Sequence, residues 1–170
     1  MNEIVKKFLL EATKTFSFLE NEYGYNVSMD FENRSHFIDS EAVVSYYSSK
    51  VGIKVFWYFA SAVIGVTFAE LINGKFPDNH SKDISIINIY ALVDFVSQGK
   101  DDIFLLKDTS IATIPKIKKR EKIINENMTG VLENLSIGVK KYAMDIVDGD
   151  TAIFPLIKKH QVELMKSRYF

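Results

Sequence analysis

Few residues in this sequence have the types and spacing that catalysis requires. The three histidines, His36, His80 and His160, lie far apart along the chain. The best candidate for a metal loop is the segment with Asp78, His80 and Asp83, whose two carboxylates and imidazole could bind a divalent ion. Asp and Asn are also ordinary turn residues, and we favour the interpretation of this segment as a loop. A small metal- or ligand-binding enzyme built around these residues is therefore kept as an alternative function.

The usual sequence motifs of enzymes and metal sites are missing. The chain has no Gly-x-Ser-x-Gly elbow, P-loop, Gly-x-Gly-x-x-Gly or His-Glu-x-x-His motif. It contains no cysteine, which excludes disulfides, cysteine zinc sites and a thiol nucleophile. Asp148, Gly149 and Asp150 resemble the start of a calcium loop, but the later ligands are lacking, so we expect helix capping there. We expect a protein that is not an enzyme and has no catalytic residue, no metal site and no cofactor.

The first concentration of charge is an acidic stretch at residues 20–41, in which Arg34 is the one basic side chain. Carboxylates on an edge strand discourage aggregation, which is the simpler explanation. They also attract a basic partner, and nearby tyrosines can supply the aromatic anchors that carry most interface energy. The predicted partner-binding residues are Glu20, Glu22, Asp30, Glu32, Asp39, Glu41, Tyr46 and Tyr47.

The second concentration is basic, with five cations in seven residues: Lys116, Lys118, Lys119, Arg120 and Lys122. These residues open a predicted helix, where the helix dipole disfavours positive charge by a few tenths of a kcal/mol each. A basic patch in such a place can bind phosphate or an acidic partner. A solvated helix face balanced by nearby acids is the simpler interpretation, and weak nucleic-acid binding through this patch is a further alternative.

Length and composition predict one domain, residues 1–170, in a soluble cytoplasmic protein. Apolar residues make up 47% of the chain and charged residues 25%, as in ordinary globular domains. The longest charge-free run, residues 55–69, is shorter than the roughly 20 residues that a membrane-spanning helix needs, and we interpret it as two buried strands. The N-terminal residues do not form the apolar core of a signal peptide.

Hydrophobic periodicity predicts an α+β fold, in which an N-terminal helix and C-terminal helices pack on an antiparallel β-sheet meander. Spacings of three and four indicate a helix over residues 2–21. Alternation and β-branched runs predict four strands, at residues 27–31, 42–48, 51–59 and 63–71. Residues 84–90 are ambiguous and precede a short helix over 91–97. From residue 116 onward the pattern is helical, with a break near Thr129 and a last helix that begins close before Pro155.

The order of several short segments is similar to that in small bacterial immunity proteins, which are encoded beside polymorphic and contact-dependent growth-inhibition toxins. The matching segments are Phe18-Leu19, Tyr23-Gly24-Tyr25, Val43 to Tyr46-Tyr47-Ser48, Ile53-Lys54-Val55, and Gly149-Asp150 before Phe154 and Leu156. The resemblance implies a protein that is not an enzyme and that binds and blocks a cognate toxin domain in the cytoplasm. It transfers no catalytic residue and no interface residue.

This resemblance agrees with the charge pattern in one respect. A basic nuclease toxin would suit the acidic stretch, whereas another class of toxin would suit the basic patch. Residues 1–115 carry 10 basic and 15 acidic side chains, and residues 116–170 carry 11 basic and 7 acidic ones. The leading expectation is therefore an inhibitor that acts by protein–protein contact. The oligomeric state is not predicted.

Overall fold

The computed structural model describes residues 2–32, 41–77, 86–101, 103–106 and 113–169. Its centre is a five-stranded sheet in which every neighbouring pair of strands is antiparallel and the spatial order is β1-β2-β3-β4-β5. The strands are β1 (Asn26–Glu32), β2 (Glu41–Tyr47), β3 (Val51–Tyr58), β4 (Val63–Glu70) and β5 (Ile86–Asn88). The predicted meander is confirmed, and the ends of the four predicted strands differ from the observed ends by at most one residue.

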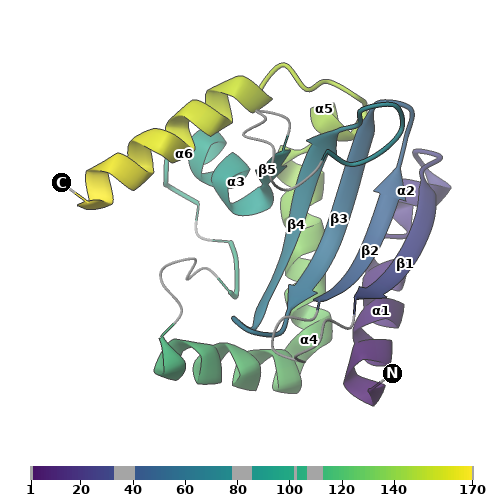
Figure 1. Cartoon of the computed structure of the whole chain (residues 1–170), viewed down its shortest axis with the longest axis vertical. Coiled ribbons are helices and arrows are strands. Elements are labelled where there is room, and N and C mark those ends of the chain that lie inside the picture. The colour runs from purple at the N-terminus through teal and green to yellow at the C-terminus, as the bar shows by residue number, and fades with distance from the viewer. Residues whose placement is uncertain (1, 33–40, 78–85, 102, 107–112, 170) are drawn as a thin grey trace.

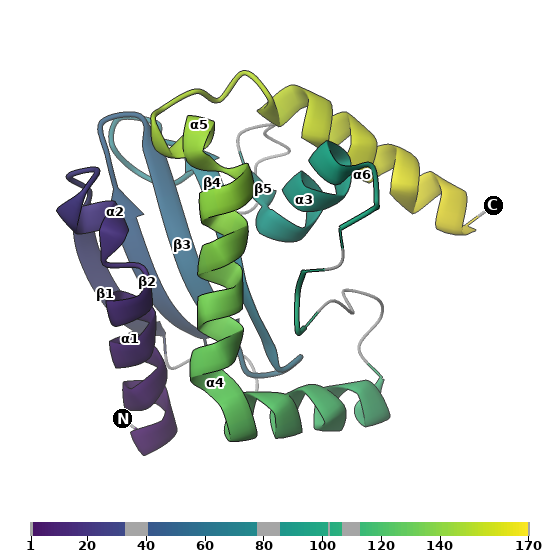
Figure 2. The ribbon, with the colours of Figure 1, turned by 180° about the vertical axis from the view of Figure 1, so that it is seen from behind.

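The helices lie on one side of this sheet, which confirms the predicted α+β architecture. They are α1 (Glu3–Thr15), α2 (Phe18–Asn21), α3 (Ile89–Ser97), α4 (Ile114–Tyr142), α5 (Met144–Val147) and α6 (Phe154–Tyr169). Figure 2 shows α1 and the long part of α4 side by side over the back of the sheet. In Figure 1 the opposite face of the sheet is toward the viewer. Among the described residues, no helix combines the length and apolar character needed to cross a membrane.

The core fills the space between the sheet and these helices. Successive strand residues point to opposite faces, so every second residue faces the helices. Burying a valine, isoleucine or phenylalanine side chain in this way contributes roughly 1.5–3 kcal/mol. The helix-facing strand residues that are fully buried are Ala42, Val44, Tyr46, Val51, Ile53, Val55, Ile64, Val66 and Phe68.

The N-terminal helix is shorter than predicted. The sequence pattern indicates one helix over residues 2–21, but α1 ends at Thr15 and the single turn of α2 follows. A continuous helix would place Phe18 about 200° around the axis from Phe16, on the solvent side. Breaking the helix lets Phe16, Phe18 and Leu19 all enter the core, where each is at most 6% exposed. Tertiary burial therefore decides where the helix ends.

Helix α4 is sharply kinked at Asn127, two residues before the predicted break at Thr129. Asn127 has φ −148° and ψ 49°, outside the helical range. Residues 114–126, here called the arm, run crosswise below the sheet, while the rest of α4 follows the strands (Figure 2). The Asn127 side chain accepts a hydrogen bond from the Gly130 amide at 3.2 Å, as an N-cap does for a new helix.

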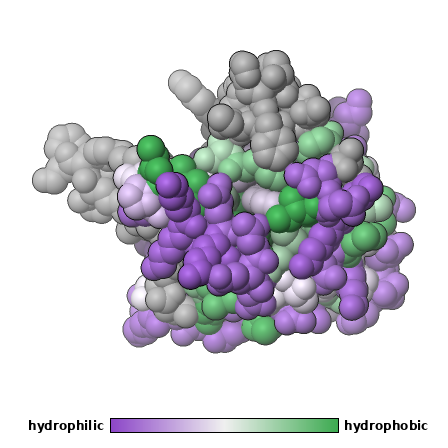
Figure 3. Space-filling model, turned by 90° about the horizontal axis from the view of Figure 1, so that it is seen from below, coloured by the Kyte–Doolittle hydropathy of each residue, from purple (hydrophilic) through white to green (hydrophobic). Residues whose placement is uncertain are grey.

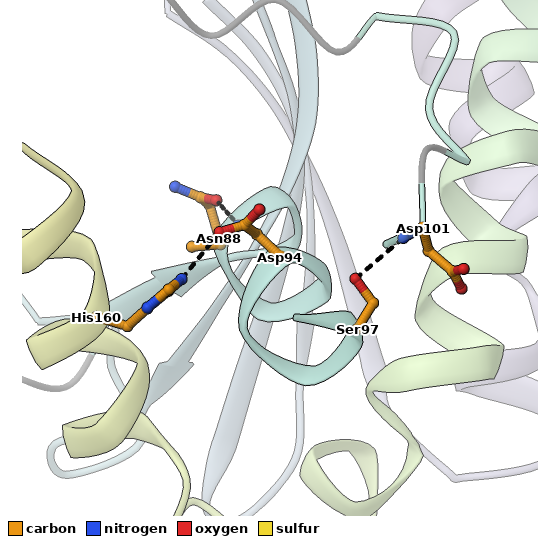
Figure 4. Close-up of polar contacts among 6 residues, drawn as sticks. Asn88, Asp94, Ser97, Asp101 and His160 are labelled. Atoms are coloured by element: carbon orange, nitrogen blue, oxygen red, sulfur yellow. Dashed lines mark hydrogen bonds and ion pairs between the residues drawn. The ribbon is translucent and has the colours of Figure 1, made fainter. Parts of the chain in front are cut away.

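Helix α6 is held to α3 by a polar contact that Figure 4 shows. His160 Nε2 lies 2.8 Å from Asp94 Oδ2, and the His160 ring also packs edge-on against Phe95. Asn88 caps the start of α3 by accepting a hydrogen bond from the Ala91 amide at 2.8 Å. His160 is thus a partly buried histidine with a hydrogen-bond partner.

Candidate protein-contact surface

No helix among the described residues covers the second face of the sheet, here called the open face. Its residues follow from the strand register, because paired residues of neighbouring strands point the same way. One row across the sheet runs from Asp30 through Val43 and Phe56 to Gly65. The adjacent row pairs Glu41 with Tyr58. Aromatic and acidic side chains therefore share this face.

Two glycines allow aromatic rings to lie flat on the open face. A Cβ atom added to Gly65 would lie 2.7 Å from the ring of Phe56, and one added to Gly52 would lie 2.5 Å from the ring of Phe76. Neither glycine has a positive φ. The sequence has glycine at these two positions because the rings occupy the space of a side chain.

The rings form two groups, and a lysine packs on one of them. Phe56 and Tyr58 have ring centroids 4.6 Å apart, and Tyr47 and Phe76 have centroids 5.2 Å apart. The Lys54 ammonium lies 4.4 Å from the centre of the Phe76 ring, which is a cation–π contact. Tyr58 remains 42% exposed. The open face therefore offers aromatic surface to a partner.

A hollow of about 60 Å³ lies between these side chains. Glu41, Lys54 and Phe56 are among the residues that line it. Pockets for small organic ligands have volumes of roughly 300–1,000 Å³ and are mostly apolar. This hollow is too small for such a ligand, and its size suits one inserted side chain of another protein.

The predicted acidic stretch is divided between two regions. Asp30 is exposed and Glu41 half-buried on the open face. Glu32 lies opposite Glu41 in the β1–β2 register, at the end of the strand. Glu20 and Glu22 belong to α2 and its C-terminal cap, at the far end of the sheet. The fold therefore separates Asp30 and Glu41 from Glu20 and Glu22, and Asp39 lies outside the described residues.

The two predicted tyrosine contacts have opposite positions. Tyr47 is half-buried on the open face, as a contact residue should be. Tyr46 points the other way and is fully buried in the core, so the prediction that it contacts a partner is wrong. Burial raises the pKa of its hydroxyl, and the nearby carboxylate of Glu20 raises it further. Adjacent strand residues cannot both face a partner.

The predicted basic patch is not one continuous surface. Arg120 is 5% exposed, and its Nη1 donates a hydrogen bond to the Ser61 carbonyl at 3.2 Å. Lys118, Lys119 and Lys122 are exposed on the other side of the arm. Seen from below, the end of the molecule where the arm lies is largely hydrophilic (Figure 3). Arg120 therefore anchors the arm, and the prediction that it belongs to a binding patch is wrong.

A second depression lies between α1 and α4, with a volume of about 390 Å³. Seven of its eight lining residues are polar or charged, and Glu11, Lys14, Glu133 and Lys140 give it balanced charge. Thr129 donates a hydrogen bond to Glu11 across it at 3.1 Å. Ligand pockets usually have the reverse composition, mostly apolar with a few polar groups. This groove is therefore a weaker candidate than the open face.

The remaining predictions concern metal binding. Asp78, His80 and Asp83 lie outside the described residues. In the part of the chain that the structure describes, no group of three or more histidine, aspartate or glutamate side chains is placed to hold a metal ion.

The candidate contact residues that charge and tyrosine spacing missed are Phe56, Tyr58 and Phe76. A sequence signal for the first two exists, because they alternate with the core residues Val55 and Trp57 along β3.

Comparison of the chain with protein-family models, curated proteins and solved structures finds no match.

Proposed function

We propose that this chain is a cytoplasmic immunity-type protein that binds a cognate toxin domain and neutralises it by protein–protein contact. The observation that supports the proposal is the open face of the sheet, where aromatic rings lie beside carboxylates. Interface energy concentrates in a few aromatic anchors surrounded by polar groups that exclude water. Phe56 and Tyr58 have this character, with Glu41 opposite Tyr58 in the strand register.

The charges of the open face favour a basic partner. The Lys54 ammonium lies over the Phe76 ring, and Lys54 and Glu41 both line the hollow. On β1 and β2 the open face carries the carboxylates of Asp30 and Glu41 and no basic residue. Complementary charge speeds association and rejects acidic proteins. A basic toxin domain, such as a nuclease that itself binds nucleic acid, fits this surface better than an acidic one.

The small hollow suggests how the partner would be recognised. Its volume of about 60 Å³ suits a single side chain, and Glu41 and Phe56 are both at its wall. A lysine or arginine of the partner would place its alkyl stem against the ring of Phe56 and its charge near Glu41. The open face would then combine an apolar anchor with an ion pair.

The test is co-expression with the C-terminal toxin domain of the large secreted protein that, on this proposal, the neighbouring gene encodes. The unaltered chain is expected to protect growth and to form a complex with the domain. The double variant Phe56→Ala with Tyr58→Ala should bind at least about 30-fold more weakly, because the loss of even one hot-spot residue costs about 2 kcal/mol or more. Calorimetry measures the affinity directly.

The matched control is Leu10→Ala, since Leu10 is an exposed apolar residue of α1 on the other side of the molecule. It should protect growth as well as the unaltered chain. Absence of both protection and a complex would show that the proposal is wrong. Equal losses of affinity in the control and the double variant would show that the open face is not the contact surface.

A further inference from the structure

Strand β1 forms the long edge of the sheet. All seven of its residues pair with β2 on one side, in the register Asn26 opposite Tyr47 to Glu32 opposite Glu41. Within the described ranges, no strand pairs with its other side, and no backbone hydrogen bond joins that side to another segment. Alternate N–H and C=O groups along this side can therefore accept another strand. The opposite edge, β5, has only three residues.

The edge of β1 lacks most features that block strand addition. Proteins protect such edges with charged side chains, above all lysine, and with proline, bulges or very short strands. β1 has no proline, glycine, lysine or arginine, and its register with β2 is unbroken. The charges that it carries, on Asp30 and Glu32, are acidic. An edge of this kind is open to pairing and selects its partner by charge.

The two faces of β1 specify different side chains on an added strand. On the open face, the exposed Asp30 would meet a basic residue of the added strand. On the helix side, Met29 is 53% exposed at the rim of the core and would be covered by an apolar residue. Because strand residues alternate between faces, the complementary strand alternates basic and apolar residues.

From these features we propose that β1 binds an extended strand of a partner protein, whose side chains alternate between basic and apolar. This inference rests on the proposed function and adds the mode of contact, since the added strand would continue the open face outward beside Asp30. A second copy of this chain is the wrong occupant. Pairing β1 with itself would bring acidic residues of both copies together, with no basic residue on either strand.

The test uses a synthetic peptide of about nine residues that alternates lysine and valine, a length typical of strands. Two-dimensional amide NMR of the full chain is expected to show hydrogen-exchange protection at alternate residues of β1 when the peptide binds. Asp30→Lys should weaken binding about fivefold, the size of one reversed cross-strand charge contact. A peptide with glutamate in place of lysine should not bind.

Glu70→Lys provides the matched control. Glu70 is also exposed and lies in the same sheet, but it is opposite Val51, which faces the helices. This variant should bind the lysine–valine peptide as the unaltered chain does. Protection elsewhere, no binding, or equal binding by Asp30→Lys and the unaltered chain would each overturn the inference.

The same amide measurement on the complex with the toxin domain separates this inference from the proposed function. A complex that forms without protection of β1 overturns strand addition and leaves the proposed function standing. Failure to form that complex, with peptide protection at β1 retained, overturns the proposed function and supports β1 as a site for basic strands.

Discussion

The hydroxyl of Tyr46 is buried in the core and has no hydrogen-bond partner among the described residues. Burying a hydroxyl without a hydrogen-bond partner destabilises the folded state, because the group loses the hydrogen bonds that it makes to water in the unfolded chain. Tyr46→Phe removes the hydroxyl and keeps the ring. We expect the free energy of unfolding to stay the same or to rise by up to about 1 kcal/mol, measured by urea denaturation. A loss of stability would show that the hydroxyl has a partner.

Arg120 and Lys119 are neighbours on the arm with opposite environments. Arg120 is buried and bonded to the Ser61 carbonyl, whereas Lys119 is exposed. Arg120→Ala removes the packing of its stem and leaves that carbonyl without this donor. It should lower the free energy of unfolding by about 2–4 kcal/mol, while Lys119→Ala changes it by less than about 0.5 kcal/mol. Similar effects of the two substitutions, in thermal and urea unfolding, would contradict the anchoring role.

Sequence reasoning resolved these residues unevenly, for reasons of geometry. Strand β2 carried a usable signal, because Glu41 and Ser45 alternate with apolar residues and share a face with Tyr47, which puts Tyr46 on the core side. For Arg120 a signal was present, because Ile117, Arg120 and Ile124 are spaced three and four apart on one side of a helix. The dense run of cations obscured it. Charge counted along the chain does not indicate where each side chain points.

At the scale of the element, the kink of α4 depends on Asn127 and Gly130 together. The Asn127 side chain bonds to the Gly130 amide, and a Cβ atom at Gly130 would lie 2.4 Å from that side chain. Glycine in a helix normally costs about 1 kcal/mol relative to alanine. Here we expect Gly130→Ala to destabilise the protein by about 1 kcal/mol, because alanine displaces the capping side chain. Urea denaturation measures the change.

The control is a double-mutant cycle with Asn127→Ala. Once the capping side chain is absent, Gly130→Ala should be neutral or stabilising, because only helix propensity remains. Additive effects of the two substitutions would mean that the residues act independently. Circular dichroism should show that the helical content is retained in each variant.

The elements themselves were largely predictable, and their interruptions were not. Periodicity placed the four long strands and the helical stripes, because burial repeats every second or every third to fourth residue. It did not place the end of α1, where three aromatic and aliphatic side chains compete for the core, or the kink at Asn127. Both depend on contacts between segments far apart in sequence. Thr129 was predicted as the break because Gly130 follows it.

At the scale of the whole molecule, the sequence predicted a layer of helices on a sheet but did not identify the open face. The apolar stripes of the helices indicate that they pack on the sheet but not on which face. Strand β3 does not decide this, because it carries apolar residues on both faces. The second apolar face is accounted for by the aromatic rings that lie over Gly52 and Gly65. The number of acidic residues in the stretch 20–41 did not predict one acidic surface, because the fold places Asp30 and Glu20 in different regions.

Tyrosines fasten the helical layer to the rest of the fold. The Tyr25 hydroxyl donates a hydrogen bond to the Val147 carbonyl at 2.9 Å, which joins the start of β1 to α5 across 122 residues of sequence. The Tyr90 hydroxyl donates to the Ile64 carbonyl at 2.8 Å and joins α3 to β4. Burial raises the pKa of both tyrosines and of Tyr46 above the ordinary value of 10.0.

These raised pKa values predict an alkaline limit to stability. Above about pH 10 the unfolded chain loses tyrosine protons that the folded chain retains, so the free energy of unfolding falls as pH rises. The contribution is fully present below that pH and is lost as pH approaches the folded-state values. Urea unfolding between about pH 8 and pH 11 measures it. Tyr46→Phe should reduce the slope relative to the unaltered chain. Equal slopes in the two proteins would show that Tyr46 is not protonated preferentially in the folded state.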